Sequence, residues 1–432
     1  MKTLRWMVLG GSVLLSAALL LQAAKTDKWT VLTGDAAAAD SKSLVPGTSR
    51  KITSDKLPAG AKATPGSQKA VPRGSAMPKA PAGFKVEIFA DTGALKPRQI
   101  RIAPNNDMFV VNATNGSVSV YRGMTADGKP MTTETFVSGL TRPFGINFYP
   151  ADNPTWVYVS TDTSVFRYAY KKGDLKASGA AETIIKDLAP AGNHFTRDIV
   201  FSKDGKSLYV AVGSADNVSD TRPVQDRRAA ILEYTPDGTY VGIFASGIRN
   251  PVGLAINPTT GELWTSINER DNLGDNLVPD YVTHVQKGGF YGWPWFYIGP
   301  HPDDRAKMVK PAEITAAKVI VPDVLLQAHS ASLGMAFYTG TKFPAEYRGD
   351  AFAAEHGSWN RSVKAGHEVV RIPLENGKAN GVYQDFLTGF VNENDQPWGQ
   401  PVGIATAPDG SLLVTDDLAS IIWRVSYVGN AK

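Results

Sequence analysis

The stretch GQPVGIATAPDGSLLVTDD (399–417) decides the fold, because the chain repeats its pattern. It contains a short strand of alternating residues, a turn built from Pro, Asp and Gly, and a second, apolar strand. RNPVGLAINPTTGELWTSI (249–267) follows the same scheme. Looser copies occupy four further stretches, which are 96–112, 141–160, 195–213 and 330–355. The chain therefore consists largely of six related β-units.

Most units continue into a third strand, such as SIIWRVSY (420–427), and are preceded by a fourth, such as YQDFLTGF (383–390). Four short strands in each of six units predict an all-β, six-bladed β-propeller over residues 84–432. No helix of consequence is expected within 84–428. A β-sandwich with chance similarity would explain neither the count of six nor the recurring P-x-G-[IL] core.

Residues 1–24 have the pattern of an export signal, because Lys2 and Arg5 precede the apolar run WMVLGGSVLLSAALLLQAA (6–24). The cleavage site before residue 25 is weak, so an uncleaved membrane anchor of about 18 residues stays open. We expect a periplasmic or secreted protein, with residues 6–24 as the alternative anchor to the inner membrane. The chain has no cysteine, which excludes disulfides, thiolate metal sites and a Cys nucleophile.

Residues 25–83 are rich in Ala, Pro, Lys, Gly and Ser and have no sustained period. This composition is typical of a flexible, low-complexity linker, although WTVLTG (29–34) suits a short pairing strand. Residues 1–83 carry a formal charge of +8, and the whole chain carries +4, which leaves −4 on residues 84–432. A mildly acidic folded domain argues against nucleic-acid binding.

In a propeller, the innermost strand of each blade lines the central channel, and the loops that enter these strands open at one mouth. The repeats place the following polar residues there: Arg98, Arg142, His194 with Arg197, Arg249 with Asn250, Ser332 and Gln400. Clustered arginines repel one another, which favours an anionic ligand as their counter-charge. His194 is a candidate general base, since an imidazole titrates near neutrality.

The fourth repeat has the densest group of acidic residues. Its second loop carries Glu269, Asp271, Asp275 and Asp280, and such carboxylate- and carbonyl-rich stretches suit a hard cation such as calcium. The loop lacks the spacing of an EF-hand, so a solvated acidic loop is an equally good interpretation. Two further histidines lie where they could line the mouth, namely His329 and His356.

Several motifs resemble the soluble quinoprotein sugar dehydrogenases, in particular their sorbosone dehydrogenase-like branch. The most specific are G-x-RNP-x-G (247–253), KGG-x-YGWP (287–294) and RGDAFAAEHGSWNRS (348–362). The resemblance covers roughly residues 84–428. It implies a propeller that binds pyrroloquinoline quinone (PQQ) and Ca²⁺, oxidises aldoses or related aldehydes, and passes electrons to an external cytochrome or quinone.

The resemblance also implies roles for individual residues. His194 matches the base that takes the substrate hydroxyl proton, Arg249 the cation beside the quinone, and Asp280 a supporting carboxylate. The backbone carbonyls of Glu269 and Arg270 match the calcium ligands. The other implied cofactor contacts are Asn250, Arg361, Lys364, Gln400 and, as a compensating cation, Arg197.

Two positions depart from the family pattern, because Gln400 and Val402 stand where arginines are common. Ala215 likewise falls where an amide side chain often lines the substrate site. Three functions therefore stay open. They are a PQQ- and calcium-dependent sugar or aldehyde dehydrogenase, a calcium-dependent lactonase with His194 activating water, and a non-catalytic binding propeller that has lost the quinone site.

Overall fold

The structure is a computed structural model that describes residues 30–60, 64–66, 69–189, 192–218 and 227–429. The leader, residues 1–24, lies outside this part of the chain, so the export signal and the anchor stay predictions. In the described part, no helix has the length and apolar character that a membrane crossing requires.

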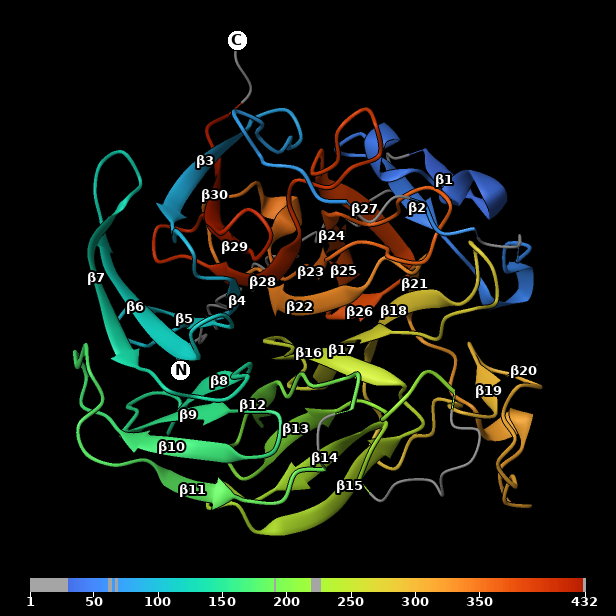
Figure 1. Cartoon of the computed structure of the whole chain (residues 1–432), viewed down its shortest axis with the longest axis horizontal. Coiled ribbons are helices and arrows are strands. Elements are labelled where there is room, and N and C mark those ends of the chain that lie inside the picture. Colours follow the sequence, from blue (N-terminus) through green and yellow to red (C-terminus); the bar gives the residue numbers. More distant parts are fainter. Residues whose placement is uncertain (1–29, 61–63, 67–68, 190–191, 219–226, 430–432) are drawn as a thin grey trace, which may run out of the picture.

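Six blades of four antiparallel strands each follow one another around a ring, and β1 and β2 extend the sheet of blade 5 to six strands; this confirms the predicted all-β, six-bladed propeller (Figure 1). Blade 1 contains β4 (Pro97–Ile102), β5 (Met108–Asn112), β6 (Ser117–Met124) and β7 (Pro130–Val137). Blade 2 contains β8 (Ile146–Tyr149), β9 (Trp156–Ser160), β10 (Val165–Ala169) and β11 (Glu182–Ile185). Blade 3 contains β12 (Ile199–Phe201), β13 (Leu208–Val212), β14 (Ala230–Tyr234) and β15 (Tyr240–Ser246).

The second half of the chain forms the other three blades. Blade 4 contains β16 (Asn250–Ile256), β17 (Leu263–Asn268), β18 (Pro279–His284) and β21 (Val324–Ala328). Blade 5 contains β22 (Ser332–Phe337), β23 (Ala351–Glu355), β24 (Glu368–Ile372) and β27 (Val382–Leu387). Blade 6 contains β28 (Pro401–Thr406), β29 (Leu412–Asp416), β30 (Ile421–Tyr427) and β3 (Phe84–Asp91). The first strand named in blades 1 to 6 is the innermost one, and each inner strand contacts those of the neighbouring blades.

Strand β3 closes the ring, because it precedes blade 1 in the chain but forms the outer edge of blade 6. It pairs antiparallel with β30, with Val86 opposite Val425. Figure 1 shows β3, in blue, beside β30, in red. The first and last strands of the propeller therefore share one sheet, and the ring opens only if their pairing breaks.

The P-x-G-[IL] core of the repeat is a β-bulge in the inner strand, as at Pro251–Gly253 of β16. Glycine is required there because the inner strands pack closely. A Cβ on Gly253 would lie 2.4 Å from the carbonyl oxygen of Leu333 in the next blade, and one on Gly403 would lie 2.3 Å from that of Arg98. The repeat thus sets the spacing between blades.

The positions just before these glycines meet in the central channel. Four of them are apolar and form one buried cluster, which consists of Phe144, Val252, Leu333 and Val402. The equivalent positions of blades 1 and 3 hold Arg98 and Arg197. We call the four apolar side chains the channel plug, because they fill the channel between the inner strands.

Short elements decorate the blades. They are the hairpin of β19 (Phe296–Tyr297) and β20 (His301–Pro302), the hairpin of β25 (Leu374–Glu375) and β26 (Lys378–Ala379), and the 3-10 turns η4 (Ala316–Lys318) and η5 (Ala345–Tyr347). The two turns are the helical elements in the described part of 84–428. The prediction of no substantial helix there is confirmed.

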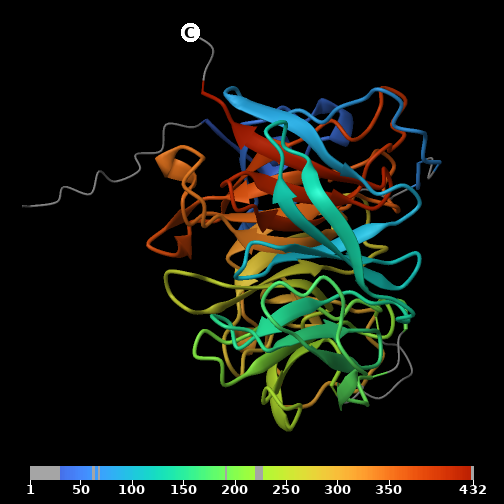
Figure 2. The ribbon, with the colours of Figure 1, turned by 90° about the vertical axis from the view of Figure 1, so that its left-hand side faces the viewer.

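The segment predicted as a flexible linker instead packs on the propeller over much of its described length. Strand β1 (Val31–Thr33) pairs in parallel with β2 (Ser49–Lys51), and β2 pairs antiparallel with β27 at the edge of blade 5. Three 3-10 turns accompany them, namely η1 (Gly34–Ala37), η2 (Ser41–Ser43) and η3 (Ser54–Lys56). Figures 1 and 2 both place these blue elements against the orange and red blades.

The physical reason for this order is a small set of tertiary contacts. Arg50 forms a buried, bidentate ion pair with Asp385 of β27, at 2.8 and 2.9 Å. Ala37, Leu44 and Ile52 are buried against the blades. WTVLTG does supply a strand, but its partner is β2 rather than a blade.

Candidate active site

A cavity of about 400 Å³ opens among the loops of blades 3, 4 and 5. Its lining residues are Asn193, His194, Asn217, Arg249, Asn250, Asn268, Glu269, Asp271, Asn272, Asp280, His329, Ala331, Trp359 and Asn360. Five of the sequence-predicted site residues are therefore brought together, namely His194, Arg249, Asn250, Glu269 and Asp280. They meet because loops at repeat-equivalent positions converge at one mouth of the propeller.

His194 is held in one orientation by Ser214. Its Nδ1 lies 2.8 Å from the Ser214 carbonyl oxygen and 3.0 Å from Ser214 Oγ. A carbonyl only accepts hydrogen bonds, so Nδ1 carries the proton and Nε2 keeps its lone pair. Burial, together with the charge of Arg249, lowers the pKa of His194 to about 3. The imidazole is therefore neutral near pH 7, which is the form that can accept a proton.

Arg197 does not line the cavity but binds the backbone of the loop that carries His194. Its guanidinium donates hydrogen bonds to the carbonyl oxygens of His194 (2.9 Å), Thr196 (2.8 Å) and Ala189 (3.1 Å). The side chain is fully buried, and burial lowers its pKa to about 10. Arg197 was predicted to be a compensating cofactor cation; its guanidinium instead holds the backbone of the loop that presents His194.

Arg249 lies in the wall of the cavity and is paired within the protein. It forms an ion pair with Asp271 at 2.9 Å and donates to the side-chain oxygen of Asn217, also at 2.9 Å. It also donates to the carbonyl oxygen of Glu269. This guanidinium is the one cationic side chain of Lys or Arg type among the residues that line the cavity in the described chain.

Asp271 links several residues of the cavity wall. The sequence indicated it only as one of four acids in a possible calcium loop and gave it no individual role. Besides Arg249, Asp271 receives a hydrogen bond from Asn360 at 2.7 Å, and His329 Nδ1 lies 3.5 Å from its carboxylate. Burial acts to raise the pKa of Asp271, but the hydrogen bond with His329 and the charge of Arg249 lower it overall. Asp271 is thus ionised and ties blades 4 and 5 together.

Asp280 is buried at the floor of the same cavity. Its carboxylate accepts hydrogen bonds from the backbone N–H groups of Glu269 and Ala331, both at 2.7 Å, and from Ser330 Oγ at 3.3 Å. Burial raises its pKa to about 7. Asp280 therefore both shapes the loops around the cavity and can exchange a proton near neutral pH.

The predicted calcium ligands have different environments. The carbonyl oxygen of Glu269 accepts a hydrogen bond from Arg249 at the cavity wall. The side-chain Oε1 of Glu269 is buried and has no hydrogen-bond partner. The Arg270 side chain is fully buried and points into the insertion of blade 4, where it pairs with Asp303 at 3.2 Å. Among the described residues, no group of three or more His, Asp or Glu side chains is arranged to hold a metal ion. A calcium site here would consist mainly of carbonyl oxygens.

Arg361 and Lys364 do not line the cavity, and their role as quinone cations stays a prediction. Arg361 donates to the carbonyl oxygens of Asp275 (2.7 Å) and Val363 (3.2 Å), and Lys364 Nζ donates to that of Ser358 at 3.0 Å. Lys364 is thus bonded within its own loop, and Arg361 bonds both its own loop and the blade 4 loop that contains Asp275. The two residues therefore shape the blade 5 loop that carries Trp359 and Asn360.

The two departures from the family pattern have structural explanations. Val402 is fully buried in the channel plug with three other apolar side chains, so no vacant cation site exists at that position. Gln400 lies outside the cavity lining, and its backbone N–H donates to Asp416 at 2.8 Å. The prediction of Gln400 as a cofactor contact is not supported by this placement.

The other cations at the mouth are balanced by the protein itself. Arg98 pairs with Asp417 at 2.5 Å, His356 lies 2.9 Å from the same carboxylate, and Arg142 lies 3.8 Å from Asp162. These carboxylates supply counter-charges within the protein, so the clustering of arginines does not by itself indicate an anionic ligand.

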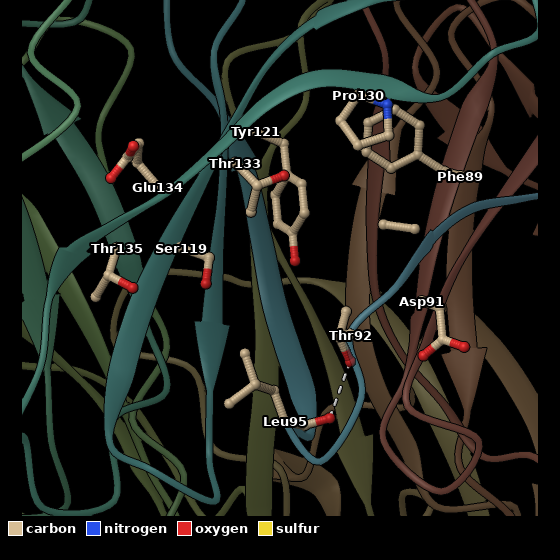
Figure 3. A pocket seen from close by; sticks show the side chains of 11 residues that line it. Phe89, Asp91, Thr92, Leu95, Ser119, Tyr121, Pro130, Thr133, Glu134 and Thr135 are labelled. Carbon is tan, nitrogen blue, oxygen red and sulfur yellow. Dashed lines mark hydrogen bonds between the residues drawn. The ribbon is translucent and has the colours of Figure 1, made fainter.

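A second cavity, of about 600 Å³, lies between β3 and blade 1 (Figure 3). Phe89, Tyr121 and Pro130 form one side, and Thr133, Thr135 and Ser119 lie along β6 and β7. Its lining contains no histidine and no cationic side chain. The first cavity is lined by two histidines, an arginine and three acidic residues, so we take it as the candidate active site.

The fold and this cavity define a six-bladed propeller with an acid–base site at one mouth. The TrAA12-like family model matches residues 78–286 and 305–427, and the chain belongs to this family. The family and its neighbours are PQQ-dependent sugar dehydrogenases, which are oxidoreductases. The matches do not single out a sorbosone-type branch.

Three similar proteins illustrate the match. An uncharacterized protein of Borreliella burgdorferi is 31% identical over 361 residues, which cover 81% of this chain and 90% of that protein. Aldose sugar dehydrogenase YliI of Escherichia coli is 26% identical over 304 residues, or 62% of this chain and 77% of that one. The holo PQQ domain of pyranose dehydrogenase from Coprinopsis cinerea superposes with a TM-score of 0.67 at 21% identity, covering 84% of this chain and all of that one.

Proposed function

We propose that the protein uses PQQ and calcium to oxidise an aldose or related aldehyde in the cavity beside His194. One observation carries the proposal: a neutral imidazole, fixed through Nδ1 by Ser214, keeps a free Nε2 lone pair in the same cavity as Arg249. A neutral base beside a fixed cation suits removal of a hydroxyl proton next to an anionic group.

The residues of the cavity fit the quinone in size and chemistry. A cavity of about 400 Å³ is within the range that holds compact cofactors. Six asparagines line it, and their amide groups can donate hydrogen bonds to carboxylates, as can Arg249. The indole of Trp359 is 58% exposed and offers a face for a planar ring.

Calcium would be held by carbonyl oxygens of Glu269 and Arg270, with the carboxylate of Asp271 in the same cavity wall. When bound, PQQ would supply the hydride acceptor and calcium a Lewis acid for the reaction. His194 takes the proton of the substrate hydroxyl at Nε2. Arg249 fixes negative charge in the cavity, and Asp280 holds the loops of blades 4 and 5 in place through Glu269 and Ala331.

Reconstitution of the purified protein tests this function. PQQ with calcium should bind saturably and raise the melting temperature, and an aldose with an artificial acceptor should turn over. Chelation of calcium should reverse the thermal shift, because a ligand that binds only the folded state stabilises it by mass action. Absence of PQQ binding at micromolar concentration would instead leave a propeller that binds another ligand.

The lactonase alternative requires carboxylates around a metal on the propeller axis. The described residues contain no such group, and the channel plug occupies the axis between the inner strands, so no observation favours this activity. For the cell, we propose export to the periplasm or beyond on the basis of the leader pattern in residues 1–24. The partners would then be a small sugar or aldehyde and an external cytochrome or quinone.

A further inference from the structure

The segment of residues 36–60, which we call the strap, lies outside the matched family region, which begins at residue 78. It nevertheless runs across blades 5 and 4, the two blades whose loops form most of the cavity. Ser49 to Lys51 add to β27 of blade 5, and Ile52 then forms a bridge with Leu325 of blade 4. The strap therefore spans the boundary between these blades.

The strap is anchored in blade 5 by Arg50. Its guanidinium forms three hydrogen bonds of 2.8 to 3.2 Å with Asp385 and also donates to the Ala37 carbonyl at 3.2 Å. Both partners of the ion pair are buried, with side-chain exposures of 4% and 0%. Buried bidentate pairs of this kind have a defined geometry, so the strap has one register on the blade.

On either side of Arg50, the strap contacts the two loops that contribute to the cavity, 268–275 in blade 4 and 358–364 in blade 5. The N–H of Ser41 donates to the carbonyl oxygen of Lys364 at 2.7 Å, and the N–H of Ala39 donates to Gln327 Oε1 at 2.8 Å. Gly60 lies so close to the blade 4 loop that a Cβ would be 2.4 Å from the Leu273 carbonyl oxygen. The strap thus contacts loop 268–275 at one end and loop 358–364 at the other.

These two loops also hold each other across the cavity. Asn360 donates to Asp271 at 2.7 Å, the N–H of Ser362 donates to Asp275 at 3.0 Å, and Arg361 donates to the Asp275 carbonyl at 2.7 Å. Asp271 in turn orients Arg249. A change in the distance between the loops would therefore reach the cation and the carboxylate of the candidate active site.

We infer that the strap is a positioning element of the active site, which fixes the spacing of loops 268–275 and 358–364 and hence the Asp271–Arg249 pair. The effect of this positioning on PQQ binding rests on the proposed function, whereas its effect on the two loops is independent of that function. The strap residues do not line the cavity, so they act through the loops and not on the cofactor.

Gly60→Ala tests the inference, because the new methyl group must push the strap away from Leu273. The matched control is Gly242→Ala, since a Cβ on Gly242 in blade 3 meets nothing within 4 Å. We expect amides of both loops to exchange hydrogen about tenfold faster in Gly60→Ala, which corresponds to ~1.4 kcal/mol of local opening free energy, and to be unchanged in the control. Global unfolding should change little in either variant.

A second variant, Arg50→Lys, keeps the charge beside Asp385 but loses the bidentate contact, and should accelerate exchange in loop 358–364 to a smaller extent. If strap amides exchange faster in these variants while both loops keep wild-type rates, the inference is wrong. The PQQ dissociation constant is the second readout; it should rise in Gly60→Ala, rise less in Arg50→Lys, and stay unchanged in the Gly242→Ala control. Faster loop exchange in a protein that never binds PQQ would refute the proposed function and leave the strap's role standing.

Discussion

His194 derives its proposed role from one hydrogen bond at Nδ1, and this gives the first prediction. His194→Ala should lower kcat of sugar oxidation by about 10²–10⁴-fold, because the base is lost, while the dissociation constant for PQQ changes little. Dye-linked turnover and quinone titration measure the two quantities. The control is His284→Ala, which removes a histidine of β18 that pairs with Asp323, and it should retain turnover. Wild-type turnover in His194→Ala would remove His194 as the base.

Arg249 is the cation of the cavity wall, so its removal should act on binding. Arg249→Met keeps the apolar stem and should weaken PQQ binding by about 10–100-fold, the worth of a charge-assisted hydrogen bond. Isothermal titration of PQQ measures this loss. Arg142→Met changes a cation at the same mouth that is 57% exposed and does not line the cavity, so its dissociation constant should match the wild type. Equal losses in both variants would contradict the assignment.

Glu355 gives a pH-dependent prediction. It is buried at the end of β23, and burial raises its pKa to about 8, whereas an unfolded chain gives it the ordinary value near 4.5. Between these two values the folded state keeps a proton that the unfolded state releases. The free energy of unfolding should therefore fall as the pH rises from about 4.5 to 8.

Glu355→Gln removes this titration and keeps the shape of the side chain. The free energy of unfolding of Glu355→Gln, relative to that of the wild type, should increase by roughly 2–4 kcal/mol between pH 5 and pH 8. Chemical denaturation at both pH values measures the difference. Glu313→Gln, on an exposed carboxyl, should follow the wild type. A constant offset between Glu355→Gln and wild type over this range would show that Glu355 is already ionised.

At the scale of the elements, the glycine of the inner strand, present in four of the six repeats, is a contact between blades. Gly253→Ala should destabilise the protein by about 1–3 kcal/mol, because the new methyl group overlaps the carbonyl of Leu333 in blade 5. Denaturant unfolding measures the loss. Gly242→Ala, with open space at its Cβ, should cost far less. Similar losses in both variants would mean that strand propensity, not blade packing, sets the effect.

The same repeat explains how much of the fold the sequence could predict. The alternation and the P-x-G-[IL] core repeat locally, so six blades and their inner strands follow from pattern alone. The strap does not follow, because its order depends on Arg50 reaching Asp385, 335 positions further along the chain. Composition describes the flexibility of an isolated segment and contains no information on such a partner.

For the site, the residues at strand entrances were the predictable ones. His194, Arg249 and Asp280 meet because the backbone of each blade fixes where its first and third strands begin. Arg361 and Lys364 lie on a long loop, and backbone carbonyls outside the cavity lining bind their side chains, that of Asp275 in blade 4 for Arg361 and that of Ser358 for Lys364. Asp271 was seen only as one acid among four, since its role depends on partners from three blades: Asn217, Arg249, His329 and Asn360.

At the scale of the whole molecule, the ring and the strap are two different ways of closing a circular structure. β3 joins blade 6 to the start of blade 1 and stabilises the propeller as a unit. The strap joins only blades 4 and 5, where the cavity lies. Global stability and the geometry of the active site are therefore controlled by separate segments of the N-terminal region.

The channel plug has a kinetic consequence. Because Phe144, Val252, Leu333 and Val402 form a buried apolar cluster where the inner strands converge, we expect no passage along the axis from the cavity to the opposite mouth. In the proposed oxidation, sugar, product and electron acceptor would then use the same mouth one after another. The proposed oxidation should accordingly follow ping-pong kinetics, with parallel double-reciprocal plots as acceptor concentration is varied and competitive inhibition by excess sugar against the acceptor. Intersecting plots would instead mean that sugar and acceptor are bound at the same time and reach the cavity by separate routes.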